Sequence, residues 1–319
     1  MQVSVTQLPG RDGAALTVRS WLPDGVSALG DASQDAGPLP RAIIQVAHGM
    51  AEHSARYGRF AEAAVARGHA VVAHDHRGHG ASAHDGLLGH VADSGGWDLV
   101  LADLEEVLDV VLRTWPGVPV VLMGHSWGSF LVRLAAARRG ADLAGMIVLG
   151  TGGDPGAVGV VGQALGALTV RVRGARATSP GLDRLVFARY NAGLRPRRTR
   201  FDWLSRDPQE VDAYLSDPWC GFVSSAAFYR DLAGGVRDVA RPQVVEATPS
   251  TLPVLVMSGD RDPVGARGRG PREVARAYRR AGSGDVSLRL HRGARHELLN
   301  ESNREEVTAE ILDWVDART

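Results

Sequence analysis

The sequence predicts an α/β protein with a largely parallel central sheet, antiparallel strands at its N-terminal edge and helices on both faces. Short apolar runs and amphipathic segments alternate over most of the 319 residues, which is typical of strands joined by helices that cover a sheet. The opening differs, because residues 2–8 and 14–22 alternate in polarity around Gly10, Asp12 and Gly13. This pattern indicates two antiparallel strands at one edge of the sheet.

Five short apolar runs predict the buried parallel strands. Runs of this length and composition are typical of strands covered on both faces. A sixth strand is expected at 286–290, where polarity alternates. Helices are indicated at 100–112 and 307–315, where apolar residues recur with helical spacing. The five apolar runs are residues 42–47, 70–73, 118–123, 145–149 and 253–257.

One long block interrupts the alternation of strands and helices. Residues 152–245 suggest short helices and loops, so we expect a helical lid between a first core part, 1–151, and a second, 246–319. Within this block, the apolar stretch 157–170 is expected to pack on the pocket or core, or to touch a lipid surface transiently. The small, polar, Pro- and Gly-rich residues 24–40 predict a surface loop.

Composition excludes several classes of function. The chain has 36 basic and 36 acidic residues, so no global charge steers it to nucleic acid, and a small neutral substrate fits as well. Lysine is absent, which excludes a Walker-type phosphate loop and a Schiff-base lysine. Cys220 is the single cysteine, so no internal disulfide forms. With no signal-peptide pattern and no apolar run of about 18 residues, we expect a soluble, cytoplasmic protein.

The stretch VVLMGHSWGSF, residues 119–129, contains the pattern G-x-S-x-G around Ser126. An apolar strand precedes it and an amphipathic segment follows. A nucleophile on so tight a strand-to-helix turn needs small neighbours, and it gains the amides of the helix N-terminus. Ser126 is therefore the predicted nucleophile.

A serine nucleophile needs a histidine that accepts its proton and a carboxylate that orients the histidine. On this architecture both follow the serine in the chain, the carboxylate first, on loops after later strands. The loop after 253–257 offers Asp262, with Asp260 as the alternative. The loop after 286–290 offers His296, whereas His291 abuts the strand end and is expected to pack structurally.

The oxyanion of an acyl-transfer intermediate needs hydrogen-bond donors, which are usually backbone amides. One is expected directly after the nucleophile, at Trp127. The other is expected in the first buried strand-to-helix loop, at Met50, because Gly49 leaves the strand and lets the next amide turn inward.

Five ordered stretches, HGMAEHSARY, AHDHRGHGAS, MGHSWGS, SGDRDPVG and ARHELLNE, together resemble the monoacylglycerol lipase and lysophospholipase branch, serine aminopeptidase-like, of the α/β-hydrolases. The resemblance spans nearly the whole chain outside the expected lid. It implies an α/β-hydrolase fold, an acyl-enzyme mechanism on carboxylic esters and no cofactor or metal. The implied residues are the triad Ser126, Asp262 and His296, the oxyanion donors Met50 and Trp127, and Glu52 and Arg56 near the polar head of a small-molecule lipid substrate.

Three alternatives remain beside this interpretation. His74, His76 and His79 have the histidine spacing of a zinc-hydrolase signature, but Gly78 stands where that signature has aspartate. A peptidase or small-ester esterase would use the same triad, since the nucleophile motif does not specify the leaving group. A non-catalytic receptor on the same fold is the more distant alternative. Acyl length, head group and oligomeric state are not determined by the sequence.

Overall fold

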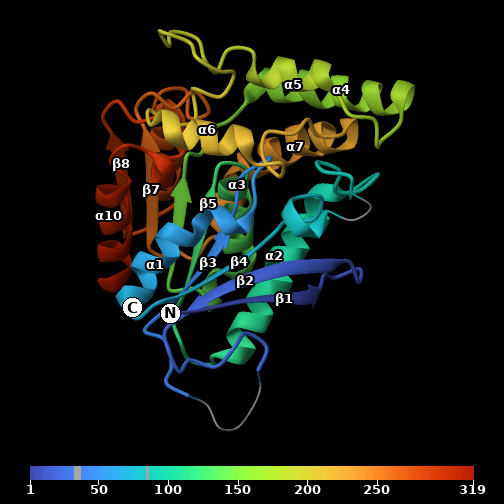
Figure 1. Ribbon diagram of the computed structural model, residues 1–319. Coiled ribbons are helices and arrows are strands. Elements are labelled where there is room, and N and C mark those ends of the chain that lie inside the picture. The colour runs from blue at the N-terminus through green and yellow to red at the C-terminus, as the bar shows by residue number, and fades with distance from the viewer. Residues whose placement is uncertain (32–36, 84–85) are drawn as a thin grey trace.

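The centre of the molecule is a sheet of eight strands, seen in a computed structural model that describes residues 1–31, 37–83 and 86–319. The strands lie in the order β1-β2-β4-β3-β5-β6-β7-β8 (Figure 1). Part of the predicted surface loop 24–40, residues 32–36, lies outside the described residues. The strands are β1 Gln2–Pro9, β2 Ala15–Leu22, β3 Ile43–Ala47, β4 Ala70–His74, β5 Val120–His125, β6 Gly145–Leu149, β7 Val254–Gly259 and β8 Val286–His291.

The sheet has the predicted mixture of strand directions. β1 pairs with β2, and β2 with β4, in antiparallel fashion, while every pair from β4 to β8 is parallel. The predicted fold class is therefore confirmed. β5 differs from the expected run 118–123, because it extends to His125 and leaves Ser126 immediately beyond its end.

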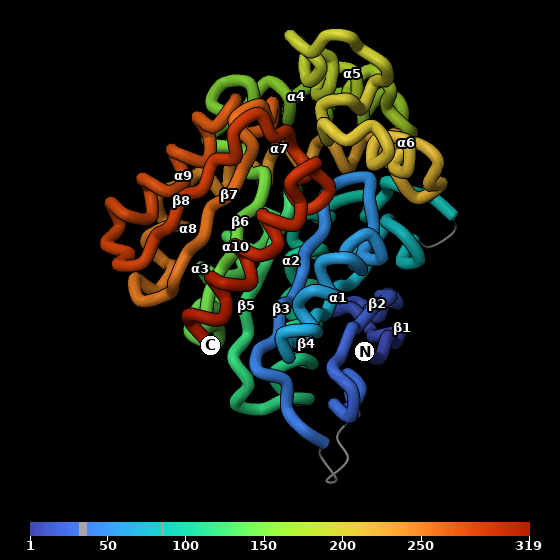
Figure 2. The backbone as a smooth tube through the Cα atoms, turned by 60° about the vertical axis from the view of Figure 1, so that its left-hand side comes forward, coloured from blue at the N-terminus to red at the C-terminus, as the bar shows by residue number. Residues whose placement is uncertain are grey.

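Helices cover both faces of this sheet, and successive strand residues serve the two faces in turn. Val121 and Met123 of β5 pack in a cluster with α1, Gly58–Ala66, and α10, Arg304–Asp316. Leu122 packs on the opposite side. That side is covered by α2 Gly96–Thr114, α3 Trp127–Arg139 and α9 Arg269–Arg280 (Figure 2).

Between β6 and β7 the chain forms five helices, and in Figure 1 four of them, α4 to α7, lie above the sheet. α4 approaches α7 through glycines: a Cβ built on Gly166 would lie 2.7 Å from the Cα of Arg230. Large side chains on the other side of α4, such as Leu168, 57% exposed, and Val172, 73% exposed, face solvent. The five helices are α4 Gly156–Arg173, α5 Pro180–Phe187, α6 Pro208–Ser216, α7 Ala226–Val239 and α8 Pro242–Ala247.

Shorter 3-10 helices connect several of these elements. They include η1 Ser54–Tyr57, η2 Gly80–Ser82, η4 Gly140–Asp142 and η5 Leu298–Asn300. In the described ranges, every helix is too short or too polar to span a lipid bilayer.

Candidate active site

Ser126 occupies a strained turn between β5 and α3. Its backbone has φ 52° and ψ −114°, in a region that side-chain-bearing residues rarely adopt. The flanking glycines explain how the turn closes. A Cβ on Gly128 would collide with the carbonyl oxygen of Ala47, and one on Gly124 would collide with the carbonyl oxygen of Gly128. The two glycines of G-x-S-x-G are thus required by close backbone approach.

The carboxylate that reaches His296 belongs to Asp262. His296 Nδ1 lies 3.0 Å from Asp262 Oδ1, and both side chains are buried. Asp262 is itself held by a hydrogen bond from the amide of Val264, 2.8 Å, and one from the hydroxyl of Ser258, 3.1 Å. These contacts orient the imidazole and direct Nε2 away from the aspartate.

The alternative carboxylate, Asp260, has a different partner. Its Oδ1 accepts a hydrogen bond from the amide of Gly293 at 2.7 Å, and its side chain is half-exposed. This contact shapes the turn that precedes the histidine loop. The hydrogen bonds of the described residues therefore favour Asp262 as the partner of His296.

A cavity of about 1210 Å³ lies above the carboxyl ends of the strands, and both Ser126 and His296 line it. Its volume exceeds the several hundred Å³ typical of small-ligand sites. Most of the remaining lining is apolar and comes from the segment between β6 and β7. Leu165 belongs to the stretch 157–170 that was expected to pack on the pocket or core; the lining side chains not identified from the sequence include Leu182, Phe187, Tyr190, Trp203, Tyr229 and Val236.

Met50 and Trp127 border the same cavity. The backbone amide of neither residue has a hydrogen-bond acceptor among the residues that the structure describes. Trp127 is the first residue of α3, whose first-turn amides have no partner inside the helix and carry its positive dipole end. Both amides are thus available to an oxygen atom inside the cavity.

Buried histidine rings hold the loop that carries Met50. The amide of His76 donates to His48 Nε2 at 2.9 Å, and His76 Nε2 lies 3.2 Å from the carbonyl oxygen of His48. Burial lowers the pKa of His74 and of His79 to about 3. These rings are therefore neutral at physiological pH, so they can pack against one another and against Trp127 without repulsion.

The histidine spacing that resembles a zinc signature serves this packing. Both ring nitrogens of His76 are engaged, Nδ1 with His74 Nε2 at 3.0 Å and Nε2 with a backbone carbonyl. A Cβ at Gly78 would collide with the carbonyl oxygen of His90. The glycine in place of the signature aspartate is thus required by the turn.

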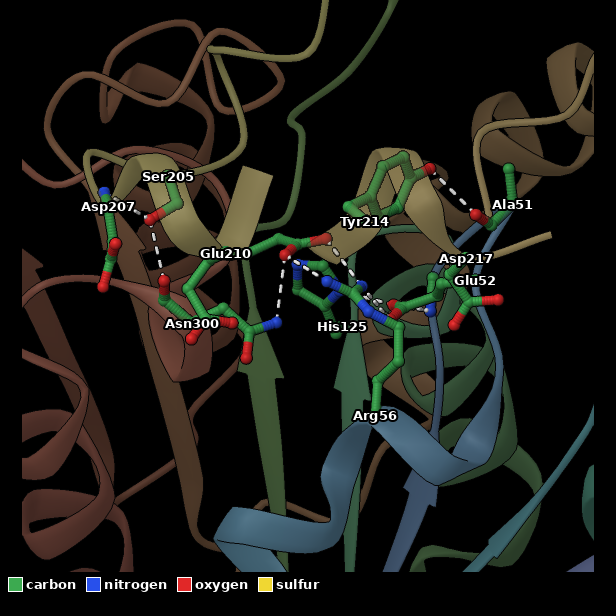
Figure 3. A network of polar contacts seen from close by, with 12 residues as sticks. Ala51, Glu52, Arg56, His125, Ser205, Asp207, Glu210, Tyr214, Asp217 and Asn300 are labelled. Carbon is green, nitrogen blue, oxygen red and sulfur yellow. Dashed lines mark hydrogen bonds and ion pairs between the residues drawn. The ribbon is translucent and has the colours of Figure 1, made fainter. Parts of the chain in front are cut away.

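A buried ionic network contains His125, the residue directly before Ser126 (Figure 3). Glu52 Oε1 accepts from the amide of Gly49 at 2.6 Å and lies 2.9 Å from His125 Nδ1. Arg56 donates to Glu52 Oε2 at 2.7 Å and to both carboxylate oxygens of Glu297, at 2.8 and 2.7 Å. A glutamate thus ties the loop of Met50 to the residue before the nucleophile.

The network fixes the charges of its members. Burial opposes ionisation of Glu52, yet the hydrogen bond with His125 and the charge of Arg56 hold its pKa well below the ordinary value. Burial likewise opposes protonation of His125, but the contacts with Glu52 raise the pKa of this histidine. The carboxylate is therefore charged at neutral pH, and the imidazole takes up a proton more readily than an exposed one.

The two expected head-group residues lie differently with respect to the cavity. Glu52 lines it, whereas the guanidinium of Arg56 lies behind it, between two carboxylates. His125 and Glu297, which complete the network, were missed from the sequence. The sequence signal that could have identified them is their position, because His125 directly precedes Ser126 and Glu297 directly follows His296.

Comparisons with known proteins agree with this geometry. The model of a family described as serine aminopeptidase, S33, matches residues 38–303. Human monoglyceride lipase is 30% identical over 316 residues, which cover 98% of this chain and 90% of that protein. A monoacylglycerol lipase from Mycolicibacterium smegmatis is 29% identical, with 86% of this chain and 88% of that protein covered.

Among solved structures, a thermostable carboxyl esterase from Bacillus coagulans in complex with glycerol superimposes with a TM-score of 0.89 and 26% identity, over 100% of this chain and 99% of that one. A soluble variant of the Saccharomyces cerevisiae monoglyceride lipase shares the fold, with a TM-score of 0.75 at 18% identity and coverage of 100% and 97%. The family resemblance stated from the sequence motifs is therefore confirmed. The chain belongs to the serine aminopeptidase, S33, family of α/β-hydrolases.

Proposed function

We propose that this protein is a serine hydrolase that cleaves carboxylic esters, most specifically monoacylglycerols or lysophospholipids. The observation that carries the proposal is the pairing of His296 with the buried Asp262 on the wall of the cavity that Ser126 also lines. The similarity to monoacylglycerol lipases of human and mycobacterial origin supports the ester-hydrolase class.

In the proposed reaction, His296 Nε2 takes the hydroxyl proton of Ser126 as its oxygen attacks the ester carbonyl. The negative charge that forms on the carbonyl oxygen is stabilised by the amides of Met50 and Trp127. The imidazolium then gives its proton to the departing alkoxide, which leaves as an alcohol. A water molecule, activated by the same histidine, hydrolyses the acyl-enzyme and releases the carboxylic acid.

We propose that residues 152–245 act as a lid that selects the substrate, between the core parts 1–151 and 246–319. The apolar cavity lining that α4, α5 and α7 supply fits an acyl chain. The outer side of α4 carries exposed valine and leucine side chains, including Leu168 and Val172. Such a surface suits transient contact with a lipid surface, and a reducing cytoplasmic setting suits the single cysteine.

The test is the variant Ser126→Ala, assayed with a short-chain nitrophenyl ester and with a fluorophosphonate probe. We expect turnover to fall by at least about 10⁴-fold and labelling to disappear, while circular dichroism and melting temperature stay unchanged. Activity retained by this variant would refute the nucleophile. Failure of the wild-type protein to react with the probe would favour a non-catalytic receptor.

A parallel comparison of monoacylglycerols, lysophospholipids and amino-acid anilides tests the substrate class. We expect the highest kcat/KM with a monoacylglycerol or a lysophospholipid. The family description as an aminopeptidase supports a peptidase as the second candidate. Preferential cleavage of the anilides would establish that alternative and leave the triad assignment intact.

A further inference from the structure

His291 ends β8 with a buried ring nitrogen that has no hydrogen bond. Its side chain is 7% exposed, and Nε2 makes no hydrogen bond in the part of the chain that the structure describes. The nearest acidic oxygen is Glu310 Oε2, which is also buried and also without a hydrogen bond. The two atoms are 3.6 Å apart, beyond hydrogen-bond distance. A buried polar pair that meets without bonding is costly unless a third group satisfies it.

The carboxylate of Glu306 lies close to the same two side chains. Glu306 and Glu310 are four residues apart on α10, so they share one side of the helix. The ligand atoms of His291, Glu306 and Glu310 all lie within 4.8 Å of one another. The amide nitrogen of Asn303 donates to Glu306 Oε2 at 3.0 Å, which fixes that carboxylate in the manner of the outer shell around a metal ligand.

We propose that His291, Glu306 and Glu310 bind a divalent metal ion of the zinc type. Zinc holds imidazole nitrogen and carboxylate oxygen at about 2.0–2.2 Å, so two ligands on one ion stand roughly 3.3–3.6 Å apart, as Nε2 and Oε2 do here. Water completes the coordination, because Glu306 is exposed.

The charges around the site favour a cation. In the described residues, no arginine forms an ion pair with Glu306 or Glu310, and two arginines from neighbouring segments have other partners. Arg206 pairs with Glu301 and donates to Asn303, and Arg304 pairs with Asp207. The two glutamates therefore leave a local excess of negative charge around the histidine nitrogen.

The histidine can adopt the tautomer that a metal requires. Coordination through Nε2 puts the proton on Nδ1. The side-chain amide Nδ2 of Asn303 makes only a long hydrogen bond of 3.4 Å with Nδ1, so binding of an ion at Nε2 would replace a weak contact. A bound ion would tie β8 to α10, which flank the loop that carries His296.

A second cluster is less suited to bind a metal ion. It consists of His53, Asp217 and Cys220. His53 Nε2 and Asp217 Oδ2 already satisfy each other at 2.8 Å. Burial raises the pKa of the Cys220 thiol, which disfavours the thiolate that a metal needs. The variant Cys220→Ser removes this competitor from the test.

The test is calorimetric titration of the metal-stripped Cys220→Ser protein with zinc chloride, with Glu306→Gln and Glu310→Gln as the site variants. Glu305→Gln is the matched control, because Glu305 is an exposed neighbour on the same helix outside the cluster. We expect one zinc ion per chain. Each site variant should bind it more than about tenfold more weakly, and the control should stay within about twofold. Zinc should also raise the melting temperature of the control variant but not of Glu310→Gln.

Anomalous diffraction at the zinc edge then locates the ion. Density between His291 and α10 would support the proposal. No zinc binding by the Cys220→Ser protein, equal affinity in the site variants and the control, or density only at His296 and Asp262 would each overturn it. None of these readouts depends on catalytic activity.

Discussion

In the loops at the carboxyl edge of the sheet, charged side chains are buried and paired, whereas in α4 the large side chains point into solvent. Glu52, Arg56 and Glu297 form ion pairs with almost no exposed surface. α4 fully buries only Gly159 and Gly166. We infer that the candidate catalytic residues are held by buried, satisfied polar contacts, while α4 rests on α7 through close glycine packing and few side-chain hydrogen bonds, such as that from Arg237 to Gln163.

The largest effect on catalysis is expected from a substitution among the buried, paired side chains. Asp262→Asn should lower kcat by about 10⁴-fold, because the amide favours the wrong tautomer of His296. Asp260→Asn, two residues away, should change kcat by less than about tenfold, since Asp260 only holds the turn at Gly293. Steady-state kinetics on a soluble ester provide the measurement. The reverse ranking would show that Asp260 is the orienting carboxylate.

The second-largest effect is expected from a substitution in the buried ionic network around Glu52. Glu52→Gln leaves Arg56 and His125 without their charged partner and should cost about 3 kcal/mol of unfolding free energy. It should also lower kcat more than it raises KM, because Glu52 holds the amide of Gly49 beside Met50. The matched control, Glu210→Gln, breaks a partly exposed pair with Arg59 and should cost less than about 1 kcal/mol. Urea unfolding distinguishes the two; equal losses would mean that burial does not strengthen the network.

The neutral histidine cluster predicts a dependence of stability on pH. The pKa values of His74 and His79 are lowered from 6.5 to about 3, so the folded state binds fewer protons than the unfolded state in this range. Their stabilisation is present above pH 6.5 and is lost as pH falls toward 3, with about 2 kcal/mol lost per histidine at pH 5.

The variant His79→Phe tests this linkage, because it keeps an aromatic ring beside Trp127 and removes one titrating group. Urea unfolding of wild type and variant at pH 7 and pH 5 gives the measurement. The loss of stability on acidification should be smaller in the variant by about 2 kcal/mol. An identical loss in both proteins would contradict a neutral His79.

The smallest effect on stability is expected in the outer side of α4. Leu168→Asp with Val172→Asp should change the unfolding free energy by less than about 0.5 kcal/mol, because both side chains are exposed and neither lines the cavity. Hydrolysis of a soluble ester should stay unchanged, while hydrolysis of an emulsified monoacylglycerol should fall several-fold. Val5→Asp, on the exposed edge strand, is the control. A similar fall in the control would mean that net charge causes the effect.

The sequence was sufficient for the sheet and for the two loops that bring a carboxylate and His296 together. Short apolar runs bounded by glycine and proline locate these strands well, because a strand that is buried on both faces is apolar along its whole length. The ends of parallel strands meet at one edge, which brings residues 126, 262 and 296 toward one cavity. The choice between Asp260 and Asp262 needed coordinates, since both follow the same strand.

Other parts of the site could not be predicted from the sequence. Glu297 and Arg56 are far apart along the chain, and their bidentate contact depends on how η5 and η1 pack together. The lining side chains from α5 and α7 depend on helix orientation, which weak periodicity in a glycine-rich segment does not define. The reason for glycine at position 78 also required coordinates, because it lies in the close approach of this turn to the backbone of His90.

The glycine contact between α4 and α7 has a consequence for how this protein evolves. Since the backbone at Gly166 rests directly on Arg230, a single added methyl group would lift the whole helix. The height of the cavity can therefore change in small mutational steps that leave every reacting group untouched. Substitutions at this one contact between two helices are therefore expected to reshape the cavity while Ser126, Asp262 and His296 stay in place.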